Sequence, residues 1–189
     1  MTDLLADTTE SASESSRRAS DRETVFVYGT LTDEDRVGEL LESFRFLGSA
    51  VCLGLRRIDG RYPTLVPGAR VTGRLLETPE IARLDAYEGV DSGLYVRVSV
   101  PIVDESSGVD DATGGGDRAF VYIADPERLG IDSADVSPAD RDVVDSPAPT
   151  RSDRTERLWP PGDSFVDRTE SYCRSASVRI VSEPRPDDP

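Results

Sequence analysis

Short apolar segments, separated by glycine and proline, predict a chain built from brief strands and helices. Five segments are rich in β-branched and aromatic residues and predict strands, and a sixth near the end of the chain would close the sheet. These expected strands are residues 24–28, 46–58, 71–76, 94–103, 119–123 and 178–181. Gly48 and Gly54 interrupt the second segment, which therefore predicts a bent or bulged strand, and Pro67-Gly68-Ala69 predicts a turn before the third.

Three other segments have the apolar spacing of helices. Thr32-Asp33 is the expected cap of the first helix, and its apolar positions are Val37, Leu40, Leu41 and Phe44. The second begins with Thr78 as N-cap and Pro79 at its first position, and Gly89 ends it. The apolar face of the third holds Phe165, Thr169, Tyr172 and Cys173.

This order of elements predicts one α+β domain with polar flanking segments. Short strands broken by glycine, with two or three helices, are typical of a small bent sheet or barrel. Low apolar content predicts disorder or flexibility elsewhere. The predicted organisation is a tail at 1–23, a domain at 24–130, a flexible acidic insertion at 131–157, a terminal helix and strand at 158–182 and a second tail at 183–189.

The amino-acid composition excludes several kinds of catalytic and metal-binding site. The 189 residues carry a net charge of −15, every cation is an arginine, and the chain has no lysine, histidine, asparagine or glutamine. Ser-His-Asp and Cys-His nucleophiles, histidine-bearing metal sites and lysine Schiff bases are therefore excluded. Cys52 and Cys173 are too few for a zinc site or a disulfide framework, so we expect two buried thiols.

The acidic charge also bears on partners and location. An excess of carboxylates repels phosphate backbones and anionic bilayers, so nucleic acid and membranes are poor candidate partners. No segment approaches the roughly 18 apolar residues of a membrane span, and the N-terminus lacks the pattern of a signal peptide. We expect a cytoplasmic protein that is a monomer or weak dimer, with a composition suited to concentrated salt.

Glu88 is the most informative residue. It follows Ile81 and Leu84 at i+7 and i+4, so a carboxylate occupies the face that two apolar residues mark as buried. Burial and the negative end of the helix dipole would both raise its pKa, as suits a general base near neutral pH. The alternative is that Glu88 turns outward at a frayed helix end or pairs with an arginine such as Arg97.

Two further features are weaker candidates. Asp85 competes with Glu88 as the functional acid, but we interpret it as a solvated residue that supports the Gly89 turn. In Tyr28-Gly29-Thr30-Leu31, an apolar strand enters a glycine turn just before a helix, which leaves consecutive amides available for a carboxylate or phosphate. An ordinary strand-to-helix turn explains the same residues.

Four motifs together resemble the gamma-glutamylcyclotransferase-like family. They are Phe26-Val27-Tyr28-Gly29-Thr30-Leu31, Tyr62-Pro63, Leu84-Asp85-Ala86-Tyr87-Glu88-Gly89 and Leu94-Tyr95-Val96-Arg97. Their order and spacing also match, over about residues 24–124. The resemblance implies a small mixed or antiparallel β-barrel of about five to seven strands with two or three flanking helices.

The resemblance also implies a reaction. The α-amino group of a γ-glutamyl substrate attacks its own γ-carbonyl, which gives 5-oxoproline and a free amine or amino acid. Glu88 takes the place of the family's catalytic acid and base, and Tyr28, Gly29, Thr30 and Leu31 become the substrate loop. Tyr62, Tyr95 and Tyr122 are possible pocket residues. This mechanism requires no metal and no cofactor.

One departure concerns the substrate. Branches that act on γ-glutamyl amino acids or glutathione typically have a polar residue after Tyr-Gly-Ser, whereas Leu31 follows Thr30 here. This form is similar to the γ-glutamylamine branch. The alternative function is a non-catalytic barrel that binds a γ-glutamyl or other carboxylated metabolite.

Overall fold

The computed structural model describes residues 22–60, 62–103, 117–131, 158–176 and 178–182. The predicted acidic insertion lies outside these residues except for Ile131, the predicted second tail lies wholly outside them, and only Arg22 and Glu23 of the predicted first tail are described. Within the described ranges, no helix is long and apolar enough to span a bilayer.

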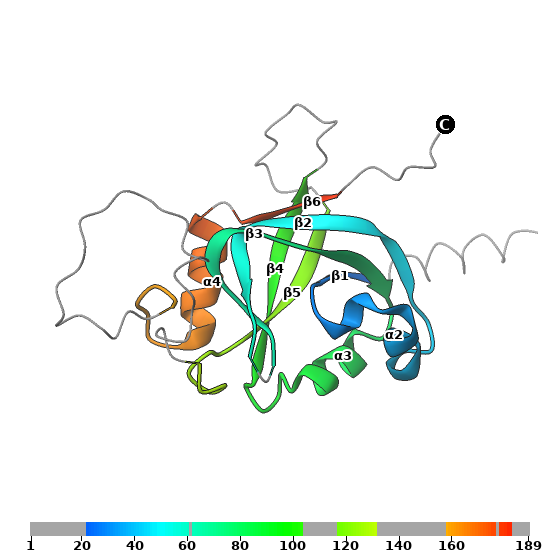
Figure 1. Cartoon of the computed structure of the whole chain (residues 1–189), viewed down its shortest axis with the longest axis horizontal. Coiled ribbons are helices and arrows are strands. Elements are labelled where there is room, and N and C mark those ends of the chain that lie inside the picture. The colour runs from blue at the N-terminus through cyan, green and yellow to red at the C-terminus, as the bar shows by residue number, and fades with distance from the viewer. Residues whose placement is uncertain (1–21, 61, 104–116, 132–157, 177, 183–189) are drawn as a thin grey trace, which may run out of the picture.

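Six strands close into a barrel in the order β1-β3-β2-β6-β4-β5. They are β1 (Glu23–Val27), β2 (Arg45–Ile58), β3 (Thr64–Thr78), β4 (Tyr95–Val103), β5 (Arg118–Ala124) and β6 (Arg179–Ser182). The β1–β5 and β4–β6 pairs are parallel and the other four are antiparallel. The predicted α+β barrel is therefore confirmed, and the last strand inserts between β2 and β4 (Figure 1).

The long β2–β3 hairpin bends where glycine was expected to bend it. The register with β3 shifts between Phe46 and Gly48 and again between Leu53 and Leu55. At the second shift, Gly54 alone lies opposite two residues of β3, because Leu53 pairs with Arg70 and Leu55 with Pro67. The predicted turn at Pro67-Gly68-Ala69 is wrong, since this bulge accommodates proline and glycine within one continuous strand.

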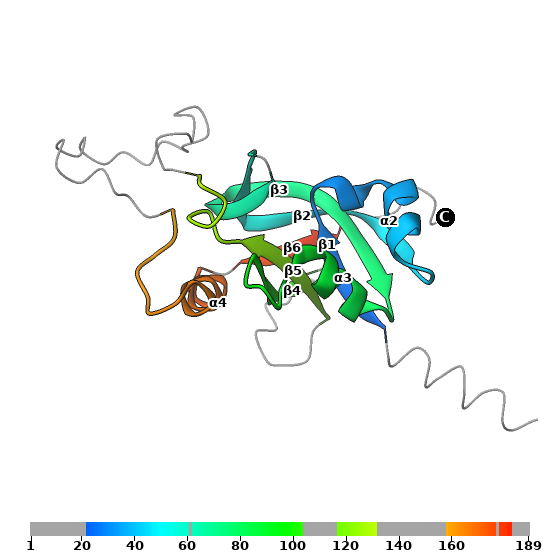
Figure 2. The ribbon, with the colours of Figure 1, turned by 90° about the horizontal axis from the view of Figure 1, so that it is seen from below.

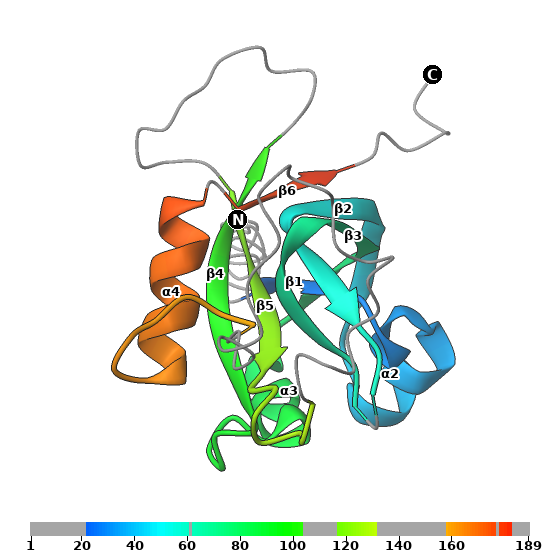
Figure 3. The ribbon, with the colours of Figure 1, turned by 60° about the vertical axis from the view of Figure 1, so that its left-hand side comes forward.

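Two apolar clusters hold the elements together. The larger draws buried side chains from all six strands and from α4 (Phe165–Ser175). The smaller packs α2 (Glu34–Leu40) and α3 (Ile81–Glu88) on β1, β3, β4 and β5. Its buried members are Val25, Val27, Leu31, Val37, Leu41, Leu76, Leu84, Tyr95, Tyr122 and Ala124. Figures 2 and 3 show α4 on the opposite side of the barrel from α2.

Capping explains where α2 begins. Asp33 is its N-cap, and the Asp33 carboxylate accepts a hydrogen bond from the amide of Arg36, as predicted. A 3₁₀ turn, η1 (Thr30–Thr32), precedes the helix. In α4, Ser164 caps the helix in the same way by accepting from the amide of Asp167.

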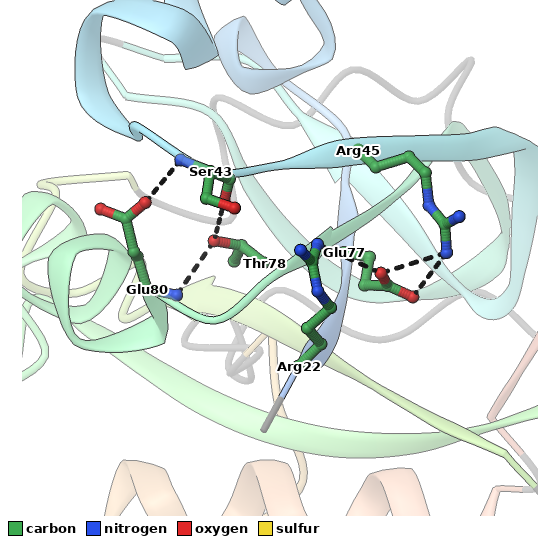
Figure 4. Close-up of polar contacts among 6 residues, drawn as sticks. All are labelled: Arg22, Ser43, Arg45, Glu77, Thr78 and Glu80. Atoms are coloured by element: carbon green, nitrogen blue, oxygen red, sulfur yellow. Dashed lines mark hydrogen bonds and ion pairs between the residues drawn. The ribbon is translucent and has the colours of Figure 1, made fainter. Parts of the chain in front are cut away.

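The start of α3 differs from the prediction. Thr78 is the last residue of β3, and Glu80 occupies the N-cap position without a side-chain capping bond. The Thr78 hydroxyl instead donates to the carbonyl of Ser43 at 2.8 Å and accepts from the amide of Glu80 at 3.0 Å. Glu80 in turn accepts from the amide of Ser43 at 2.6 Å (Figure 4). These bonds attach the helix to the segment before β2, beside the Glu77 ion pairs with Arg22 and Arg45.

The expectation for the two cysteines is confirmed. Cys52 of β2 and Cys173 of α4 are free and buried in the larger apolar cluster. Burial raises the pKa of each thiol to about 12, so both remain protonated and behave as small apolar side chains.

Candidate active site

A cavity of about 460 Å³ lies where the end of β1 meets α3 and the start of β4. Its walls are formed by apolar and aromatic side chains together with one carboxyl group. The lining residues are Phe26, Val27, Tyr28, Gly29, Thr30, Leu31, Tyr62, Pro63, Tyr87, Glu88, Leu94, Tyr95 and Tyr122. The structure thus brings together every residue that the sequence marked as catalytic, substrate-binding or pocket-lining, whose roles remain predictions.

The loop after β1 presents backbone donors to this cavity. The carbonyl of Gly29 accepts from the amide and hydroxyl of Thr32, and the carbonyl of Thr30 accepts from the amide of Asp33. Among the described residues, no group accepts a hydrogen bond from the amide of Gly29, Thr30 or Leu31. Leu31 is buried, Gly29 is half-buried and Thr30 is exposed, so the amides of this turn are available to hold an anionic or carbonyl oxygen that enters the cavity.

Two arginines that the sequence analysis missed hold the loop from outside. Arg57 of β2 donates to the carbonyl of Tyr28 at 3.0 Å, and Arg74 of β3 donates to the carbonyl of Thr32 at 2.9 Å. Each arginine therefore satisfies a carbonyl at one end of the loop. Only the antiparallel register of β1, β3 and β2 brings them there, so no local motif could have identified them.

Glu88 is the last residue of α3, and its position in the cavity follows from how the helix packs. Leu84, one turn earlier, is fully buried, so the same face of the helix points toward the barrel. Gly89 ends the helix in the left-handed region at φ 69° and ψ 40°, where glycine carries no steric cost. The Glu88 carboxyl group is partly buried and has no hydrogen-bond or ion-pair partner among the described residues.

The environment of Glu88 favours its neutral form. Burial raises the pKa of Glu88 from 4.5 to about 7, because the charged carboxylate loses hydration that nothing in the cavity replaces. Arg97, the suggested partner of Glu88, pairs instead with Asp85 at 2.9 Å. A carboxyl group with a pKa near neutral pH can both accept and return a proton.

Three buried tyrosines use their hydroxyl protons within the protein. Tyr28 donates to the carbonyl of Tyr122 at 2.7 Å, Tyr95 donates to the carbonyl of Pro63 at 2.9 Å, and Tyr122 donates to Asp85 at 2.8 Å. Burial raises the pKa of all three hydroxyls above 10, and the nearby charge of Glu88 adds to the rise for Tyr28 and Tyr95. These side chains therefore form neutral walls whose donors are already engaged.

The prediction that Asp85 is a solvated residue is wrong. Its carboxylate accepts from the Tyr122 hydroxyl and from Arg97, and its side chain is only about a quarter exposed. The cause lies in the barrel, because Arg97 of β4 and Tyr122 of β5 are cross-strand partners directly opposite each other. The sequence analysis considered Asp85 as an alternative functional acid but missed its partners, Arg97 and Tyr122, which lie on other elements.

We expect Glu88 to make the folded protein less stable as pH rises from about 4.5 to about 7. In this window the folded state retains a proton that the unfolded state has already lost, so raising the pH favours unfolding. The difference between the two pKa values corresponds to at most about 3 kcal/mol. Glu88→Gln should therefore match the wild type at pH 4 and be more stable at pH 8.

Urea unfolding of both proteins at constant salt measures this difference. Glu39→Gln, on the exposed surface of α2, is the control that removes an acid without changing the cavity. Equal free energies of unfolding for wild type and Glu88→Gln at pH 8 would contradict the prediction that ionised Glu88 destabilises the folded protein.

The fold and the site together define a small closed β-barrel protein with one ligand-sized cavity at the candidate site, lined by an acidic side chain. Residues 25–140 match the model of the family described as gamma-glutamyl cyclotransferase, AIG2-like. That match covers more than half of the sequence, and the chain belongs to this family.

Relatives of known sequence or structure are similar over part of their length. AIG2-like protein A of Arabidopsis thaliana is 34% identical over 116 residues, which cover 56% of this chain and 66% of that protein. The chain thus matches slightly less than two thirds of that relative. A solved gamma-glutamyl cyclotransferase is 19% identical, covers 55% of this chain and 67% of its own, and has a TM-score of 0.45. A solution structure from Arabidopsis thaliana is 27% identical, with 65% and 76% covered and a TM-score of 0.44.

Proposed function

We propose that this protein is a cyclotransferase that converts a γ-glutamyl compound to 5-oxoproline and a free amine, with Glu88 as the general acid and base. One observation carries the proposal. The partly buried Glu88, with a pKa of about 7 and no described partner, lines the same cavity as the unpaired amides of Gly29, Thr30 and Leu31. Membership in the family supports this assignment.

The proposed reaction uses these groups in sequence. The loop amides of Gly29 to Leu31 bind the substrate α-carboxylate, which places the α-ammonium group near Glu88. Ionised Glu88 takes a proton from the ammonium group, and the free amine attacks the γ-carbonyl carbon to form a five-membered ring. As the bond to the leaving amine breaks, Glu88 returns the proton to that nitrogen, and the second proton of the ring nitrogen also passes to the amine, which leaves as an ammonium ion. One carbon–nitrogen bond forms, one breaks, and the enzyme ends as it began.

We further propose that γ-glutamylamines are preferred to γ-glutamyl amino acids. The described lining residues include no arginine, so a second carboxylate on the leaving group would lose hydration without gaining a partner there. Tyr62 and Tyr87 also line the cavity and are 46% and 44% exposed, so they offer aromatic surface to an organic amine. Leu31, in place of a polar residue, supports the same preference.

We expect the wild-type protein to release 5-oxoproline from γ-glutamylamines such as γ-glutamyl-benzylamine and γ-glutamyl-putrescine. We expect kcat/KM to be at least about tenfold lower for γ-glutamyl-alanine and glutathione, because the leaving group of each carries an additional carboxylate. Chromatographic measurement of 5-oxoproline in concentrated salt makes the comparison. N-benzylglutaramic acid, which keeps the γ-amide and one carboxylate but lacks the α-amino group, is the control and should release no benzylamine.

Two outcomes would contradict these proposals. Equal turnover of γ-glutamyl-alanine and γ-glutamyl-benzylamine would remove the preference for amines while leaving the cyclotransferase assignment in place. Saturable binding of γ-glutamylamines without release of 5-oxoproline would favour the non-catalytic barrel that binds a carboxylated metabolite.

A further inference from the structure

A single carboxylate joins α3 to two neighbouring strands beside the cavity. One oxygen of Asp85 accepts from the Tyr122 hydroxyl at 2.8 Å, and the other pairs with Arg97 at 2.9 Å. The Arg97 guanidinium also lies 4.6 Å from the centre of the Phe120 ring. Because Arg97 and Tyr122 face each other across β4 and β5, Asp85 fixes the helix against both strands at one point.

The same contacts continue to the loop that faces Glu88. The carbonyl of Tyr122 accepts from the hydroxyl of Tyr28, the first residue of the Tyr-Gly-Thr-Leu loop. Two hydrogen bonds, one to the hydroxyl and one to the backbone carbonyl of Tyr122, therefore connect Asp85 of the helix with Tyr28 of the loop. Tyr122 and Tyr28 also line the cavity, so these bonds connect Asp85 to two residues of the cavity wall.

The location of Asp85 on the helix makes this attachment important for Glu88. The start of α3 is attached through Thr78 and Glu80, whereas Glu88 lies at the other end, immediately before the Gly89 turn. A helix of eight residues has little stability of its own and depends on tertiary contacts. Asp85, one turn before Glu88, joins this end of the helix to β4 and β5, whereas Tyr87 of the same turn interacts with Arg36 of α2.

We propose that Asp85 is a positioning residue, whose bonds to Tyr122 and Arg97 hold the last turn of α3 so that Glu88 faces the substrate loop. Asp85 does not line the cavity and contacts no substrate in this role. The inference rests on the proposed function of Glu88. It assigns separate tasks to two acids in one helix: Glu88 transfers the proton, and Asp85 determines where that transfer occurs.

Three substitutions test the role of Asp85 in turnover. Asp85→Ala removes both contacts, and we expect kcat to fall about 30- to 100-fold with KM changed less than about threefold, because a misplaced base slows chemistry more than binding. Asp85→Asn keeps an acceptor for Tyr122 and should recover most of that loss. Tyr122→Phe removes the hydrogen bond to Asp85 and should lower kcat in the same way. The double variant should be little worse than Asp85→Ala alone, since Asp85→Ala has already removed that hydrogen bond.

A second measurement does not depend on turnover. The ¹³C chemical shift of the Glu88 carboxyl group, followed against pH, should show a midpoint near 7 in the wild type and in Asp85→Asn. In Asp85→Ala the midpoint should move towards 4.5, because the loosened last turn admits water. The titratable side chains that share the cavity with Glu88 are all tyrosines: Tyr28, Tyr62, Tyr87, Tyr95 and Tyr122.

Asp91→Asn is the matched control, since it removes one exposed acid just beyond the same helix. An active wild type whose kcat and Glu88 midpoint are both unchanged in Asp85→Ala would overturn the positioning role while leaving the proposed function intact. An inactive wild type would instead contradict the proposed function. If Asp85→Ala does not fold, Asp85→Asn and Tyr122→Phe still test the positioning role. A kcat equal to wild type in Tyr122→Phe would also overturn the inference.

Discussion

Replacing Glu88 with glutamine is expected to lower kcat for 5-oxoproline release by about 10²- to 10⁴-fold, the usual contribution of a general acid or base. Glutamine has nearly the same size and fills the same place, but it cannot accept the ammonium proton. KM should change by less than about threefold, because the loop amides that bind the substrate carboxylate are unaltered. Steady-state kinetics on γ-glutamyl-benzylamine at pH 8 provide the measurement.

The pH dependence of wild-type turnover also tests Glu88 as the general base. Since the ionised carboxylate must take the proton, kcat/KM should rise with pH and level off above about 7, following the pKa of the free enzyme. Glu39→Gln, remote from the cavity, should keep both the rate and the profile. A Glu88→Gln variant that retained the wild-type rate would show that another group performs the proton transfer.

Replacing Gly73 with alanine is expected to destabilise the protein by about 2–4 kcal/mol. A Cβ on Gly73 would overlap the carbonyl oxygen of Val27 and lie 2.7 Å from the Phe26 ring, closer than packed atoms allow. Val27 is the last residue of β1, so the shift needed to relieve this overlap would also move Tyr28 and the loop after it. Urea unfolding measures the stability, and the steady-state assay would record a loss of turnover in the fraction that remains folded.

Gly38→Ala in α2 is the matched control for that substitution. Its added methyl group would meet nothing closer than the Phe44 ring at 3.9 Å, and alanine is the better helix former by about 1 kcal/mol. We therefore expect Gly38→Ala to be neutral or stabilising. If Gly73→Ala had the same small effect, the close approach of β3 to β1 would not be a constraint on this fold.

Much of the fold could be predicted because its information is local. Gly48 and Gly54 indicated a bent strand, and the apolar alternation near Val178 indicated the strand that closes the barrel. Pro67 and Gly68 led to the wrong prediction of a turn, because these residue types favour turns locally. The pairing with β2 overrides that preference, because Pro67 pairs with Leu55 and the bulge opposite Gly54 accommodates the two residues that follow Pro67.

In the candidate site, too, some residues could be predicted from local sequence and others could not. Helical spacing identified Glu88 as an acid on the buried face, since periodicity depends only on neighbouring residues. The bonds from Arg57 and Arg74 to the loop carbonyls, and the contacts of Asp85, depend on strand register. A charged residue whose partner comes from another strand looks like a solvated residue in the sequence, which explains the wrong interpretation of Asp85.

The position of β6 between β2 and β4 has a consequence for synthesis on the ribosome. Five of the six strands can emerge and pair while the barrel still has two open edges, because residues 179–182 are translated last among the strands. Unpaired strand edges are templates for pairing with other chains. Until β6 is inserted, the nascent chain is therefore a partly formed sheet that can aggregate through its unpaired edges. Insertion of β6 pairs the edges of β2 and β4 and so removes these sites of aggregation.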